Sequence, residues 1–178
     1  MKEKKERILS VETSDALNFL LYVHNYAKQE KHHFPYLPNN PWKLQEQAFL
    51  QPLLKKIWNK TLTSTTYPPL PIYQQKENFQ LLFLDNDSFE SCMNTFYSWW
   101  KSMAGQMAME RFIGQDGYNT LYTLFRLTNK EQLTIHLLYE NTILGDSAVN
   151  DQLVLTLRET FIQEELIKIV QERLSLID

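Results

Sequence analysis

The feature of this sequence that most constrains its fold is a stretch between residues 88 and 112 that is both apolar and aromatic. At helical spacing, one stripe of large side chains follows the stretch and a second lies beside it. The two stripes contain Phe89, Cys92, Met93, Phe96, Tyr97, Trp99, Trp100, Met103, Ala104 and Met107. Fully burying one large apolar side chain is worth about 1.5–3 kcal/mol, so the spacing predicts a long helix at the centre of the core.

This apolar arc is wider than packing against one neighbouring element requires, so two interpretations stay open. Either the whole arc belongs to the core, or part of it lines a ligand pocket or a partner groove, where aromatic residues and Met are enriched. Trp99 and Trp100 point about 100° apart on a helix, so one of the two is expected at an edge or an interface.

The length and composition fit one domain covering residues 1–178. Of these residues 43% are hydrophobic and 13% are aromatic, which is enough for one core, whereas two halves would each be marginal. Residues 1–10 are expected to fray, since their charges alternate. Residues 61–78 are expected to form an irregular connector that contains a proline-rich run.

Three further helices are expected outside the aromatic stretch. A helix is expected over residues 11–30, after N-cap candidates that include Ser14. A second helix is expected from Pro41, with a break near Gln51, because Pro52 lacks the N–H that a helix needs. A last helix is expected over residues 150–176, where apolar residues recur at helical spacing.

Strands are expected only beyond residue 78. Residues 79–84 form a short apolar run bounded by polar residues. Residues 121–127 and 133–139 both alternate, and one register pairs them as an antiparallel hairpin, although 118–127 also fits helical spacing. The sequence therefore predicts an α+β fold, predominantly helical with four to five helices and a small antiparallel sheet of about three strands, in the order α-α-β-α-β-β-α.

Charge and cysteine content limit the expected partners and setting. The net charge is −3, with 18 basic and 21 acidic side chains and no concentrated basic footprint, so we expect no nucleic-acid partner. No apolar run approaches the roughly 20 residues that span a bilayer, so no membrane association is expected. A lone cysteine and the lack of a secretory signal pattern favour a cytoplasmic protein.

No motif identifies a metal site, a cofactor or a catalytic centre. The sequence lacks the HExxH and CxxC patterns, and on one helix His24 and His32 would lie about 12 Å apart along the axis. His33 is placed no better, so we expect neither a metal nor a cofactor. Cys92 falls mid-helix on the apolar face, where a thiol is unreactive. Whether the chain is an enzyme stays open.

A candidate site lies where the aromatic helix would meet one face of the hairpin. Its polar set includes His136, which could act as an acid or a base because imidazole titrates near neutrality. The candidate pocket residues are Trp99, Trp100, Met103, Glu110, Tyr122, Arg126 and His136.

Two functions are weighed for this sequence. One is a non-enzymatic binding or regulatory module that uses the aromatic and Met-rich helix, either as a homodimer or with another protein. The alternative is a small-molecule-binding protein or enzyme with a pocket between the helix 88–112 and the hairpin 121–139.

Overall fold

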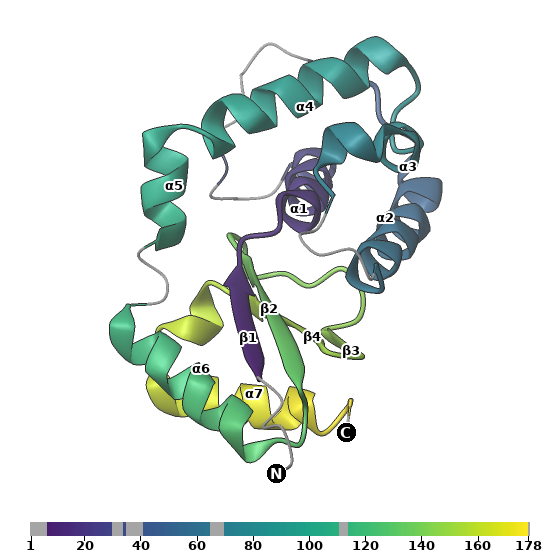
Figure 1. The fold of residues 1–178 in the computed structure, drawn as a ribbon. Helices are drawn as coiled ribbons and strands as arrows, with labels where there is room; N and C mark the ends of the chain where they lie inside the picture. Colours follow the sequence, from purple (N-terminus) through teal and green to yellow (C-terminus); the bar gives the residue numbers. More distant parts are fainter. Residues whose placement is uncertain (1–6, 30–33, 35–40, 65–69, 111–113, 178) are drawn as a thin grey trace.

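The computed structural model describes residues 7–29, 34, 41–64, 70–110 and 114–177, which form a mixed α+β structure (Figure 1). The described strands are β1 (Ile8–Glu12), β2 (Gln132–Leu138), β3 (Ala148–Val149) and β4 (Gln152–Thr156). The described α-helices are α1 (Asp15–Lys28), α2 (Gln47–Leu62), α3 (Lys76–Gln80), α4 (Asn86–Trp100), α5 (Met103–Glu110), α6 (Gln115–Leu127) and α7 (Gln163–Leu174). The predicted α+β class is confirmed.

The sheet is mainly parallel. Its strand order is β1-β2-β4-β3, in which β1 pairs with β2 and β2 with β4 in parallel, and only the short β3 is antiparallel. The predicted antiparallel sheet was therefore wrong. Side-chain alternation identifies a strand but not its direction, and the charged start of the chain hid β1, whose residues 8–10 we expected to fray.

The register of the strands gives the sheet one polar and one apolar face. Glu12 is the partner of His136, and Ser10 is the partner of Thr134, so these side chains share a face. Leu9 and Val11 of β1 point to the opposite face. Arg7 continues this second row, and its guanidinium lies 4.6 Å from the ring centroid of Phe125 in α6. Helix α6 therefore lies on the apolar face.

The predicted hairpin was half right. Residues 132–138 form β2, close to its predicted second arm, but residues 121–127 belong to α6, which was the helical alternative. Leu121, Leu124 and Phe125 are buried. This three- and four-residue spacing matches one helix face, and packing on the sheet selects it over alternation.

Two other expected elements differ from the structure. Residues 79–84 form the end of α3 and a turn, in which only Phe83 makes an isolated bridge, to Leu44. The helix expected over residues 150–176 is wrong in its first part, because residues 152–156 form β4 and α7 begins only at Gln163. Asn150 adopts a left-handed conformation, with φ at 53°, in the turn between β3 and β4. That turn begins a strand, and α7 follows it.

Helix α2 continues through Pro52 without the break expected near Gln51. Pro52 lies in the second turn of this helix, so its missing N–H removes a single bond, to the carbonyl of Ala48. The buried residues Leu50 and Leu54 on either side of the proline hold both halves against the core.

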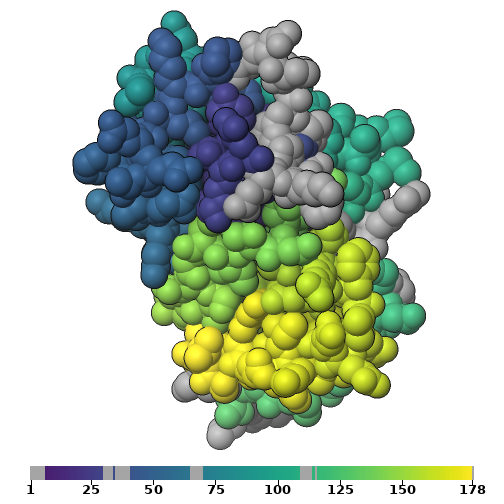
Figure 2. Space-filling model, turned by 180° about the vertical axis from the view of Figure 1, so that it is seen from behind, coloured from purple at the N-terminus to yellow at the C-terminus, as the bar shows by residue number. Residues whose placement is uncertain are grey.

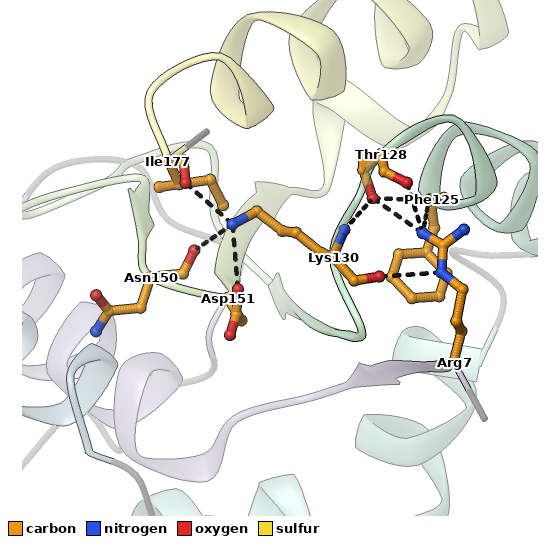
Figure 3. A network of polar contacts seen from close by, with 7 residues as sticks. All are labelled: Arg7, Phe125, Thr128, Lys130, Asn150, Asp151 and Ile177. Atoms are coloured by element: carbon orange, nitrogen blue, oxygen red, sulfur yellow. Dashed lines mark hydrogen bonds and ion pairs between the residues drawn. The ribbon is translucent and has the colours of Figure 1, made fainter. Parts of the chain in front are cut away.

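Two basic side chains link the segments before β1 and after α7 to the loop between α6 and β2 (Figure 3). The Arg7 guanidinium donates to the carbonyl oxygens of Phe125 at 2.8 Å, Thr128 at 2.8 Å and Lys130 at 3.0 Å, near the end of α6. Lys130 Nζ in turn donates to the carbonyl of Ile177 at 3.0 Å. A cation here meets the carbonyls that a helix end leaves unpaired.

Seen from behind, α1 and α2 form one end of the molecule, and the residues that follow α6 form the other (Figure 2). None of the described helices is both long and apolar enough to cross a bilayer.

We predict that Arg7→Ala will destabilise the protein by about 1–2 kcal/mol, because the carbonyls at the end of α6 lose a charged donor. Arg7→Lys should recover only part of this loss, because an ammonium cannot reproduce the planar fork of the guanidinium. Chemical denaturation measures both variants. Equal stability of Arg7→Ala and the parent protein would contradict this role.

A pH dependence is expected from Glu159. Burial acts to raise the pKa of Glu159, but hydrogen bonds from Arg173, at 2.6 and 3.0 Å, and from the Thr156 N–H outweigh it and lower the pKa. The unfolded chain therefore takes up this proton first as the pH falls. The stabilisation is complete above the ordinary carboxyl pKa of 4.5 and is lost below it. In denaturation series below neutral pH, Glu159→Gln should lose less stability on acidification than the parent.

Candidate functional site

The candidate residue Trp100 belongs to the core. It ends α4, its side chain is 5% exposed, and its ring stacks on that of Phe96 with the centroids 5.3 Å apart. The indole Nε1 donates to Asp15 Oδ1 at 2.7 Å, and Lys101 Nζ lies 3.1 Å from the other carboxylate oxygen. Trp100 thus fixes the end of α4 to the start of α1.

Trp99 is half-buried and lies at the edge of the same aromatic core. Its ring centroid is 5.3 Å from that of Phe34 and 4.8 Å from that of Tyr139. The expectation that one of the two tryptophans lies at an edge agrees with this placement. Phe89 and Phe96 are wholly buried, so most of the aromatic arc is core.

The long helix expected over residues 88–112 is broken between α4 and α5. The Ser102 hydroxyl donates to the Trp99 carbonyl at 2.5 Å and accepts from the Gly105 N–H at 3.2 Å, as an N-cap does. A Cβ on Gly105 would lie 2.5 Å from the Trp99 oxygen, so only glycine allows this close approach. The chain therefore turns, and α5 leaves the line of α4.

Helix α5 presents its methionines to solvent. Met103 is 78% exposed and Met107 is 43% exposed, whereas Gly105 is the one buried residue among positions 103–108. Glu110 ends α5, and its side chain lies outside what the structure describes. The Met-rich end of the predicted helix is thus a surface, although its aromatic part is core.

The sheet separates the remaining candidates. Tyr122, which is 45% exposed, and Arg126 both lie on α6, on the apolar side of the sheet. His136 points to the other face. No hydrogen bond, ion pair or ring contact joins Tyr122 or Arg126 to any of the other candidate side chains that the structure describes. The seven residues therefore do not form one pocket.

His136 lies at the centre of a buried polar cluster that joins three strands. Its Nε2 is 2.7 Å from Gln152 Oε1 on β4, and its Nδ1 is 2.9 Å from Glu12 Oε1 on β1. Gln152 Nε2 donates to the Ser64 carbonyl at 3.1 Å, just beyond α2. His136 is only 4% exposed.

Hydrogen-bond logic fixes part of the proton arrangement in this cluster. The Ser64 carbonyl can only accept, so the amide nitrogen of Gln152 must face it and Oε1 must face the ring. His136 Nε2 is then a donor. Nδ1 lies 2.9 Å from Glu12 Oε1, a close contact that lacks the direction of a hydrogen bond. With Nε2 bonded to Gln152 and Nδ1 facing Glu12, the His136 ring links β2 to both neighbouring strands.

Two cavities of the described structure are lined by other residues than the seven candidates. A shallow groove of about 460 Å³ between α6 and α7 is lined by Asp116, Asn119, Thr120, Thr123, Leu124, Gln163 and Ile167. A smaller one of about 170 Å³ lies between the end of β1 and Pro71, and it contains Glu12 and Asp15. The carboxylates of the second cavity already have contacts within the protein, since Glu12 faces His136 and Asp15 binds Trp100 and Lys101.

No cluster of three metal-ligating side chains occurs in the part of the chain that the structure describes. His24 is buried in α1, and His32 and His33 lie outside the described residues. Burial raises the pKa of the Cys92 thiol, which keeps it protonated within α4.

No known family model matches the sequence, and no curated protein or solved structure shows significant similarity to it.

Sequence reasoning missed the partners of His136 and the turn before α5. Glu12 was placed inside the helix expected over residues 11–30 and Gln152 inside the last expected helix, so neither was set beside a histidine. Ser102 carried a usable signal, since serine is a preferred N-cap residue. The apolar periodicity through this point hid it.

We predict strong energetic coupling between Glu12 and His136. His136→Leu and Glu12→Leu should each destabilise the protein by about 3 kcal/mol, because each leaves a buried polar partner behind. The double variant should be less destabilised than the sum of the two, by at least about 1 kcal/mol in urea denaturation. Additive effects would show that the two groups do not interact.

Proposed function

We propose that this protein is a non-enzymatic binding module whose protein partner docks on α5. The observation that carries the proposal is the exposure of Met103 and Met107, at 78% and 43%, on a helix without a charged residue between positions 103 and 108. A surface helix normally turns a charged face to water. Flexible, polarisable methionines suit a surface that adapts to a partner.

The anchoring of α5 supports the same function. Gly105 packs against the backbone of Trp99 and Trp100, and Trp100 is fixed to Asp15. A helix already held in place loses little conformational freedom when a partner binds, so more of the contact energy appears as affinity. We keep the cytoplasmic setting expected from the single cysteine as part of this proposal.

We predict that Met103→Glu combined with Met107→Glu abolishes partner binding without unfolding the protein. Glu and Met have similar helix propensities, and surface changes of this kind usually alter stability by less than about 0.5 kcal/mol. The partner is captured in cells with a photoreactive residue at the exposed Gln106, identified by mass spectrometry and then purified. Its dissociation constant should rise at least tenfold with the double variant, about 1.4 kcal/mol.

The matched control places the photoreactive residue at Gln171, which is exposed on α7. Docking on α5 predicts a discrete crosslinked adduct when the photoreactive residue is at position 106. The same adduct should not form from position 171, and it should be lost in the Met103→Glu, Met107→Glu variant. Identical adducts from both positions, or none from Gln106, would rule out α5 as the docking surface.

A second candidate function, binding of a small polar ligand, is favoured by the groove between α6 and α7. Its rim combines hydroxyl and amide groups with the carboxylate of Asp116, over a floor that includes Leu124 and Ile167. Such a lining suits a neutral or cationic polar compound. NMR titration with polar fragments tests it: the amides of Asn119 and Thr123 should shift in the parent protein and not in Thr123→Leu.

A further inference from the structure

Strand β1 is an edge of the sheet, with β2 as its one neighbour (Figure 1). The Ile8 N–H donates to the Glu131 carbonyl at 2.9 Å, which fixes the direction in which each β1 residue points its backbone groups. In a parallel pair these groups alternate, so those of Ile8, Ser10 and Glu12 face β2. The N–H and C=O groups of Leu9 and Val11 therefore point outward.

These outward groups have no hydrogen-bond partner among the described residues. Residues 8–12 contain no proline or lysine, two residues that commonly protect an edge strand, and the one charged residue among them, Glu12, is at the end of the strand. The side chains of Leu9 and Val11 are half-buried against the core, so the open groups lie at its border. A strand of this kind is a template for another strand.

We propose that β1 pairs in antiparallel fashion with β1 of a second copy of this chain, across a two-fold axis at Ser10. This register sets Leu9 opposite the second copy's Val11, and Val11 opposite the second copy's Leu9. Antiparallel strands exchange both N–H···O bonds at every second residue pair. The outward groups lie two residues apart and symmetric about Ser10, so the pairing satisfies all of them and joins the two sheets into one.

The side chains favour a second copy over an unrelated peptide. On the apolar face each Leu9 meets a Val11, an aliphatic pair that includes a β-branched residue. Glu12 falls opposite the second copy's Ile8, so the two Glu12 carboxylates lie at opposite ends of the paired strands. A parallel pairing would instead set the two Glu12 carboxylates side by side, and like charges directly opposite are destabilising.

Proline substitution tests the pairing, because it removes a single N–H. Leu9→Pro or Val11→Pro deletes an outward donor and leaves the ladder with β2 intact, and edge strands tolerate proline at such positions. Sedimentation of the parent chain should show a monomer–dimer equilibrium, whose dissociation constant rises at least tenfold in either variant. Val11→Thr keeps the N–H and should dimerise as the parent does.

A second measurement needs no variant and covers the case in which proline unfolds the strand. Amide exchange of Leu9 and Val11 in the parent protein should slow as the protein concentration rises, while that of Ser10, already bonded to β2, changes little. A monomer at all concentrations overturns the proposal, as does a dimer whose proline variants associate equally well. Protection of Leu9 and Val11 only after an extended peptide is added would assign the edge to another protein.

This surface is separate from α5. If the protein is a monomer but the methionine double variant loses the partner, the β1 pairing is overturned and the proposed function stands. If the protein dimerises through β1 but the double variant still binds the partner, the proposed function is overturned and the β1 pairing stands.

Discussion

The parallel pairing of β1 with β2 is the contact on which the rest of the fold depends. Arg7, which precedes β1, binds the carbonyl of Lys130, which lies 123 residues later in the chain. Parallel strands need a crossover connection, and here it consists of α1 to α6. Closing so long a loop costs entropy, although the cost grows slowly with length. The contacts of Arg7 with the end of α6 offset part of that cost, because they form only when the loop is closed.

The crossover contains a core of its own, and this explains why α5 is exposed. Phe19 and Phe96 join α1 to α4, with ring centroids 5.4 Å apart. The Asn18 amide nitrogen donates to the Leu137 carbonyl at 3.0 Å, and its oxygen accepts from the Tyr139 N–H at 2.7 Å, which attaches this core to the end of β2. Helix α5 lies between this helical core and α6 along the chain (Figure 1). It is a connection, and its methionines are left facing water.

The parts of the fold that local periodicity determines could be predicted. The helix up to Trp100 and the strand from Gln132 each present one consistent pattern. Strand β1 could not be predicted, because its pairing partner lies more than a hundred residues away and because it begins next to charged residues. Helix α6 fits both periods, and only packing on the sheet selects one. Because residues 121–127 were predicted to form a strand, Tyr122 and Arg126 were predicted on the same sheet face as His136. They lie on α6 instead, so the candidate residues do not form one site.

The two edges of the sheet differ in a way that bears on function. At one edge β3 has two residues, and a very short edge strand offers little for another chain to pair with. At the other edge β1 has five residues and open backbone groups at Leu9 and Val11. Figure 1 shows β1 as the strand nearest α5, the helix with exposed methionines. The fold therefore shortens the β3 edge of the sheet and leaves open backbone groups at the β1 edge, on the side of α5, whose residues 103–108 carry no charge.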